Sequence, residues 1–216
     1  MPAFLDASDQ DPSVQWPLPQ DWQPNARCLR LGVMASGEGS NFEALARACS
    51  SGWATIALLV VNNAGCGAQT RAERLGIPHT LIDHRAYPNR EALDQALIAA
   101  FNVQNVDLVV MAGWMRIVTP VLIQAFPNRL INIHPSLLPS FRGLDGVGQA
   151  LAAGVKLTGC TAHLVSEAVD AGEILVQAAV PVHSNDDHAR LSERIHRQEH
   201  RILPLAVALA AQRLGL

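Results

Sequence analysis

Residues 129–143 read Arg-Leu-Ile-Asn-Ile-His-Pro-Ser-Leu-Leu-Pro-Ser-Phe-Arg-Gly, a short apolar run that two prolines soon interrupt. The run predicts a β-strand, in which Asn132 and His134 point to the same face because they are two residues apart. Open α/β sheets bind their ligands at the carboxyl ends of such strands. Asn132 can donate a hydrogen bond to a developing oxyanion, and His134 can donate one or transfer a proton. A histidine in this place can also simply tie down the following loop.

The chain around this strand alternates apolar runs with segments of helical spacing. This alternation, with strands that are apolar on both faces, indicates an α/β fold whose mostly parallel sheet is covered by helices on both faces. A long C-terminal helix is expected to begin near Asp187, and Pro204 is expected to kink or divide it. The expected strands are 31–35, 55–61, 79–82, 107–111, 130–133, 161–165 and 174–182, and the expected helices are 42–48, 69–75, 90–101, one that begins at Thr119 and Pro120, and 147–153.

Composition narrows the class of protein. The chain has 216 residues, 49% of them hydrophobic, which allows one sizeable core in a single domain over residues 30–216. Residues 1–29 hold five prolines without a clear period and are expected to form an irregular N-terminal arm. The formal charge is −3 and no basic stripe occurs, so no nucleic-acid partner is expected. The longest apolar run, 54–61, is too short to cross a bilayer.

The cysteines and the N-terminus favour a cytoplasmic protein. The four cysteines lack CxxC spacing and are expected to be reduced thiols, and no signal peptide is visible. Cysteines and histidines show no metal-ligand spacing, so no metal is expected. The size is compatible with a monomer or a homodimer.

The segment 36–41, Ser-Gly-Glu-Gly-Ser-Asn, lies between the first expected strand and helix. Its glycines allow backbone N–H groups to approach an anion at the N-terminus of the helix. It matches neither GxGxxG nor a P-loop, so a phosphate monoester is a better guess than a dinucleotide or a nucleoside triphosphate. The alternative is a tight turn in which Ser40 or Asn41 caps the helix.

Three further segments have a functional and an ordinary interpretation. Asp170, in the turn 169–173, is either a turn residue or a carboxylate beside His134 that favours its imidazolium form and relays a proton. The segment 113–118 is either the floor of a pocket for a flat heterocycle or plain core. Glu199 either contacts sugar hydroxyls or belongs to a solvated helix face.

Together these segments resemble the phosphoribosylglycinamide formyltransferases, folate-dependent enzymes of purine synthesis, in order and spacing from about Arg30 onward. The matches are Ser-Gly-x-Gly-Ser-Asn at 36–41, Ala-Gly-Trp-Met-Arg-Ile at 112–117, Asn-Ile-His-Pro-Ser-Leu-Leu-Pro at 132–139, Thr/Cys-x-His at 160–163, Val-Asp-x-Gly at 169–172, Gln-Ala-x-Val-Pro-Val at 177–182 and Gln-Glu-His at 198–200. The resemblance implies a single-domain formyltransferase fold with a Rossmann-like sheet.

The resemblance also implies a reaction, in which the amine of glycinamide ribonucleotide attacks the formyl carbon of 10-formyltetrahydrofolate. Asn132 and protonated His134 would stabilise the oxyanion, and Asp170 would help to move the proton. Residues implied to bind the ribonucleotide are Gly39, Ser40, Asn41, His196 and Glu199. Residues implied to bind the folate are Arg90, Met115, Arg116, Ile117, Val118, Asn132, Ser166, Glu167, Ala168, Val169 and Asp170.

The sequence departs from the family pattern in two places. Residues 141–145, Phe-Arg-Gly-Leu-Asp, replace a common Pro-Gly-Leu-His, and Glu173 replaces a usual proline.

Three other functions are open. Formyltetrahydrofolate hydrolase shares the Asn-His-Asp set, but an N-terminal regulatory domain and a different loop at 36–41 are expected of it. Methionyl-tRNA formyltransferase would carry a C-terminal RNA-binding domain. A non-catalytic nucleotide-binding module would bind the substrates without formyl transfer.

Overall fold

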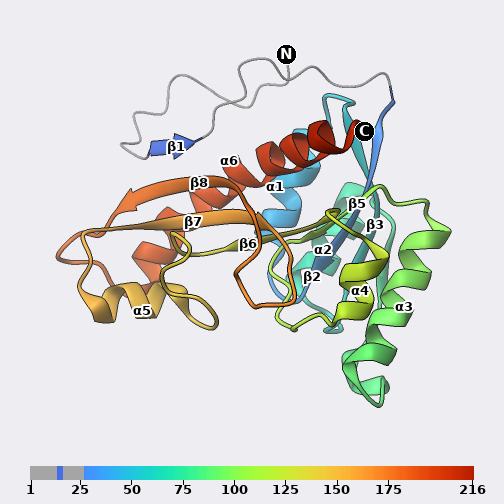
Figure 1. Ribbon diagram of the computed structural model, residues 1–216, viewed down its shortest axis with the longest axis horizontal. Coiled ribbons are helices and arrows are strands. Elements are labelled where there is room, and N and C mark those ends of the chain that lie inside the picture. The colour runs from blue at the N-terminus through green and yellow to red at the C-terminus, as the bar shows by residue number, and fades with distance from the viewer. Residues whose placement is uncertain (1–13, 17–26) are drawn as a thin grey trace.

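The computed structural model describes residues 14–16 and 27–216, and its centre is one eight-stranded sheet (Figure 1). The strand order is β1-β8-β7-β6-β5-β2-β3-β4. The strands are β1 (Val14–Trp16), β2 (Leu29–Ala35), β3 (Ala54–Val61), β4 (His79–Leu81), β5 (Leu108–Met111), β6 (Leu130–His134), β7 (Leu157–Leu164) and β8 (Ile174–Pro181).

The sheet has a parallel part and an antiparallel part that meet at β6. The pairs β3–β4, β2–β3, β2–β5 and β5–β6 are parallel, as the apolar runs predict. The pairs β6–β7, β7–β8 and β1–β8 are antiparallel, which the sequence pattern did not distinguish. The short connection 165–173 explains the antiparallel direction of the β7–β8 pair, because parallel neighbours need a longer crossover.

Helices cover both faces of the sheet, as predicted. The side chains of β2 alternate between the two faces: Leu31 and Val33 pack in one hydrophobic core and Met34 packs in the other. The first core is closed by α1, α2, α5 and α6, and the second by α3 and α4. The helices are α1 (Ser40–Cys49), α2 (Gly67–Leu75), α3 (Arg90–Val103), α4 (Pro120–Ala125), α5 (Gly146–Ala153) and α6 (His188–Leu214), with a 3-10 turn, η1 (His84–Ala86), before α3.

The C-terminal helix α6 shows that Pro204 does not divide it, one of the two effects predicted for this proline. Its N-terminus is as expected, because the Asp187 side chain accepts a hydrogen bond from the Arg190 amide. Pro204, however, lies inside a continuous 27-residue helix and does not divide it. Residues 202–208 are all buried against the first core, so packing compensates for the backbone hydrogen bond that proline cannot make. Figure 1 shows α6 lying along β7 and β8.

The predicted arm contains one regular element. Residues 14–16 form β1, which pairs antiparallel with residues 177–179 at the edge of β8, so this part of the arm is a strand and not irregular. The prediction for residues 1–13 and 17–26 lies outside the described residues. Among the helices of the described part, none is both long and apolar enough to cross a membrane.

Candidate active site

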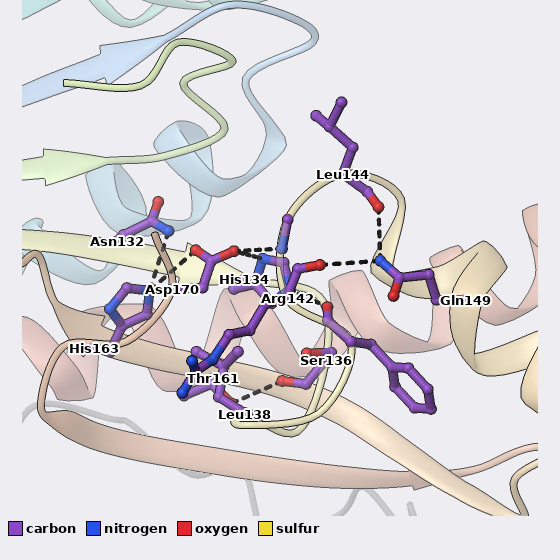
Figure 2. Close-up of polar contacts among 12 residues, drawn as sticks. Asn132, His134, Ser136, Leu138, Arg142, Leu144, Gln149, Thr161, His163 and Asp170 are labelled. Atoms are coloured by element: carbon purple, nitrogen blue, oxygen red, sulfur yellow. Dashed lines mark hydrogen bonds and ion pairs between the residues drawn. The ribbon is translucent and has the colours of Figure 1, made fainter. Parts of the chain in front are cut away.

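The end of β6 and the turn after β7 bring the three predicted catalytic side chains together. Asn132 and His134 are on β6, and Asp170 is in the turn that leads to β8 (Figure 2). The His134 Nδ1 atom lies 3.3 Å from Asp170 Oδ2, so the two side chains meet directly. Both side chains are less than one tenth exposed, which strengthens the electrostatic interaction between them.

A second histidine, His163 on β7, completes this group and was quoted only as part of a motif in the sequence. It stands opposite Asn132 in the antiparallel pairing of β6 with β7. Its Nδ1 lies 2.8 Å from the Leu164 carbonyl oxygen, which can only accept, so Nδ1 carries the proton. The free Nε2 accepts from Asn132 Nδ2 at 3.2 Å and lies 3.7 Å from Asp170 Oδ1. His163 therefore orients the Asn132 amide. This role could be recognised only from the register of β6 and β7.

The electrostatics of Asp170 keep it ionised. Burial alone would raise its pKa, but the neighbouring His163 ring, the hydrogen bond from the Gly143 amide and the positive charge of His134 lower it below its usual value of 3.8. The Gly143 N–H donates to Asp170 Oδ2 at 2.8 Å. Asp170 is thus a permanent negative charge beside His134 near neutral pH.

These side chains form one wall of a pocket of about 280 Å³. Met115 and Ile117 stand at its rim with more than half of their surface exposed, which is typical of an apolar binding site open to a ligand. The pocket is lined by residues 111, 113–118, 132–135, 143–145, 163 and 165–170. The residues predicted to bind the folate at 115–118 and 166–170 therefore line the same pocket. Arg90, at the start of α3, is exposed and is not part of this lining.

The loop 36–41 lies between β2 and α1, as predicted. Gly39 has φ 75°, and a Cβ there would lie 2.6 Å from the Ala68 Cα, so only glycine fits. Gly39 is also the N-cap of α1, and no side chain caps this helix. The alternative in which Ser40 or Asn41 caps α1 is therefore wrong, because the left-handed glycine already sets the start of the helix.

Helix α6 reaches this loop through Glu199. Asn41 Nδ2 donates to Glu199 Oε2 at 2.7 Å, and Glu199 is only 3% exposed, so it does not belong to a solvated face. Burial raises the pKa of Glu199, against the hydrogen bond from Asn41 and the positive charge of His196 and His134. The Asn41 Oδ1 atom has no hydrogen-bond partner although it is buried. This pair thus offers polar atoms to a ligand next to the loop. His196 itself is exposed.

No group of three or more potential metal ligands occurs in residues 14–16 and 27–216. The arrangement instead provides hydrogen-bond donors, a buried histidine and a fixed carboxylate. Such groups can stabilise an oxyanion and move a proton, which are the two requirements of an acyl transfer.

Comparison with known proteins defines the class of protein first. The formyl transferase family model matches residues 29–207, which is most of the chain, and the chain belongs to this family. Within it, the chain is 41% identical over 189 residues to the phosphoribosylglycinamide formyltransferase of Bacillus subtilis, covering 87% of this chain and 95% of that protein.

Two other relatives extend this comparison. The crystal structure of glycinamide ribonucleotide transformylase 1 from Symbiobacterium toebii superposes with a TM-score of 0.84 at 44% identity, covering 86% of this chain and 88% of that one. The human trifunctional purine biosynthetic protein adenosine-3 is 44% identical over 184 residues, or 84% of this chain. The chain spans only 18% of the length of that protein, so it resembles one portion of it.

Proposed function

We propose that this formyltransferase carries the formyl group of 10-formyltetrahydrofolate to the amine of glycinamide ribonucleotide, giving formylglycinamide ribonucleotide in purine synthesis. The observation that carries the proposal is the meeting of Asn132, His134 and Asp170 in the wall of one pocket. The names and full-length coverage of the relatives support the same reaction.

The chemistry assigned to the three side chains follows from their geometry. As the substrate amine adds to the formyl carbon, the formyl oxygen becomes an oxyanion, which the Asn132 amide and the His134 imidazolium stabilise. The Asp170 carboxylate, 3.3 Å from His134 Nδ1, holds the imidazole ring in position. The new C–N bond then remains while the bond to the folate nitrogen breaks, and the amine proton passes through the His134–Asp170 pair to that nitrogen.

Two binding regions flank these residues in the proposal. The apolar pocket receives the pterin of the folate, with residues 115–118 on one side and the loop 166–170 on the other. The backbone N–H groups of Gly39, Ser40 and Asn41 hold the phosphate of the ribonucleotide. Glu199 and the exposed His196 contact its ribose. Arg90 lies outside the pocket lining and is assigned only to the distal tail of the folate.

The reaction partners in this proposal are small molecules, with the folate as co-substrate and without a metal. All four cysteines are free thiols, which fits a reducing cytoplasm. Whether the enzyme works as a monomer or a homodimer is left to a measurement of its mass in solution.

An absorbance assay with 10-formyltetrahydrofolate, with and without glycinamide ribonucleotide, tests the function. Turnover that requires the ribonucleotide and disappears in His134→Ala is the expected result. His79→Ala, on the edge strand β4 and separated from β6 by β5, β2 and β3, is the matched control and should retain activity. Turnover without the ribonucleotide would instead indicate a hydrolase. Binding of both substrates without turnover would indicate a binding module.

A further inference from the structure

The loop 141–145, which departs from the family pattern, has an unusual backbone. Phe141, Gly143 and Asp145 all have positive φ angles, of 56°, 80° and 54°. Non-glycine residues rarely adopt this left-handed conformation, so the surroundings must hold Phe141 and Asp145 in it. The loop connects the end of β6 with the start of α5 and borders the pocket.

Two peptide groups of this loop contact the two central catalytic side chains. The Phe141 carbonyl oxygen lies 2.8 Å from His134 Nε2, and the Gly143 N–H donates to Asp170 Oδ2 at 2.8 Å. A carbonyl can only accept, so the Phe141 contact keeps a proton on His134 Nε2. In this arrangement the other ring nitrogen, Nδ1, is the one that faces Asp170. The ionised Asp170 carboxylate also can only accept, so both contacts are satisfied together when the ring carries a proton on each nitrogen. The loop backbone thus sets the orientation of the histidine ring and the position of the carboxylate.

The segment before this loop is firmly anchored. The Ser136 hydroxyl donates to the Ser140 carbonyl at 2.6 Å, and the Thr161 hydroxyl donates to the Ser136 carbonyl at 2.7 Å. Gln177 Nε2 donates to the Leu138 carbonyl at 2.9 Å. The segment 136–140 is therefore tied to β7 and β8 by side-chain hydrogen bonds.

One side chain outside the loop holds its central residues. The Gln149 Nε2 atom donates to the carbonyl of Arg142 at 3.1 Å and to that of Leu144 at 2.9 Å (Figure 2). These two carbonyls flank Gly143, whose N–H contacts Asp170. Gln149 is on α5, and its own side chain is exposed, so changing it does not disturb the hydrophobic cores. Its amide bridges the loop directly behind the contact with the catalytic carboxylate.

We propose that Gln149 is a positioning residue: by bridging the carbonyls of Arg142 and Leu144, it holds the loop 141–145 so that Phe141 orients the His134 ring and Gly143 fixes Asp170. The inference rests on the proposed function where formyl transfer is the readout. The ring-nitrogen NMR shifts of His134 give a second readout that does not depend on the reaction.

Gln149→Glu is the decisive variant because it keeps the shape of the side chain and removes both donated hydrogen bonds. Gln149→Lys keeps donors at the end of a similar stem and is the rescue variant. Gln124→Glu, an exposed residue of α4, makes the same charge change away from the loop. Formyl transfer to glycinamide ribonucleotide and thermal unfolding are measured for all three. Imidazole nitrogen NMR at alkaline pH follows His134, whose signals are assigned by their absence in His134→Gln.

The expected result is a fall in kcat of about tenfold for Gln149→Glu, with both KM values within about twofold and the folded state retained. Its His134 ring-nitrogen shifts should move from their wild-type values, because the Phe141 carbonyl no longer holds the Nε2–H group, and Gln149→Lys should recover most of both properties. Unchanged His134 signals in Gln149→Glu overturn the proposal, even if kcat falls. If the wild type transfers no formyl group to the ribonucleotide, the proposed function fails while the NMR comparison still decides the role of Gln149.

Discussion

The site joins two regions that are built differently, the catalytic end at β6 and the loop 36–41 beside α1. At the catalytic end, His134 and Asp170 are held by backbone groups of a divergent loop, through Phe141 and Gly143. At the other end, the buried side chains of Asn41 and Glu199 hold each other. Under the proposed function, we expect the first region to govern the rate and the second to govern binding of the ribonucleotide. Substitutions in the two regions should therefore separate kcat from KM.

Asp170→Asn should have the largest effect. The asparagine oxygen still accepts from the Gly143 amide, but the negative charge beside His134 is lost. We expect kcat to fall by about 10²- to 10⁴-fold, with both KM values little changed, because charge stabilisation in the transition state is removed. Steady-state kinetics with both substrates measures this. A fall of less than about tenfold would remove Asp170 from the chemical step.

Glu199→Ala should have the next largest effect, and in the other kinetic parameter. It removes the carboxylate that Asn41 contacts and leaves the Asn41 amide without this partner. We expect KM for glycinamide ribonucleotide to rise by about 10- to 100-fold while KM for the folate stays within about twofold. An equal rise in both KM values would contradict the division of the site into two regions.

The ion pairs of Glu43, close to the loop 36–41, give a prediction about how the stability of the protein depends on pH. Glu43 on α1 is nearly buried and forms ion pairs with Arg47 on its own helix and with Arg71 and Arg74 on α2. The hydrogen bond from Arg47, and those from the other two arginines, outweigh burial and lower the pKa of Glu43 from 4.5 to about 2. A pKa that is lower in the folded state stabilises the protein above the unfolded value, and this contribution is lost as the pH falls from 4.5 toward 2.

Glu43→Gln should remove that contribution. We expect the free energy of unfolding near neutral pH to fall by about 1–3 kcal/mol, since three exposed or half-exposed arginines lose a common partner. Denaturant unfolding at neutral and acidic pH measures it. The variant and the wild type should become equally stable as the pH approaches 2, and a difference that persists there would assign the loss to packing instead of charge.

The sequence predicted the α/β class, the helices on both faces and the shared face of Asn132 and His134, because these depend on local patterns. Strand periodicity placed Asn132 and His134 on one face, and both line the pocket. The antiparallel direction of β7 and β8 was not predicted, because an apolar run does not specify the direction of its neighbour. The role of His163 depends on this direction, and the continuity of α6 through Pro204 depends on tertiary packing.

The loop 141–145 could not be predicted because its function lies in its peptide groups. The side chains of Phe141 and Arg142 do not indicate that the backbone carbonyl of Phe141 reaches the His134 ring. Gly143 and Gly146 were the sequence signals of an unusual backbone in this loop. Their role can be recognised only from the three-dimensional structure. A change of side chains in this loop is thus compatible with the same contacts to His134 and Asp170, since backbone contacts depend on conformation rather than on side-chain identity.

Gly146→Ala is expected to have the smallest effect and tests the catalytic region alone. A Cβ at Gly146 would lie 3.2 Å from the carbonyl oxygens of Phe141 and Pro135 and 3.3 Å from His134 Nε2, so its neighbours must move by a few tenths of an ångström. Because the Phe141 carbonyl and the His134 ring are the groups displaced, we expect kcat to fall by about threefold with both KM values unchanged. Gly154→Ala, at the other end of α5, is the control for the backbone conformation of the helix. A Cβ at Gly154 would meet no atom within 4 Å. The φ of 66° at Gly154 makes some loss of stability expected in this control. A change in KM for the ribonucleotide in Gly146→Ala, with kcat intact, would show that the loop 141–145 serves binding rather than the alignment of His134 with Asp170.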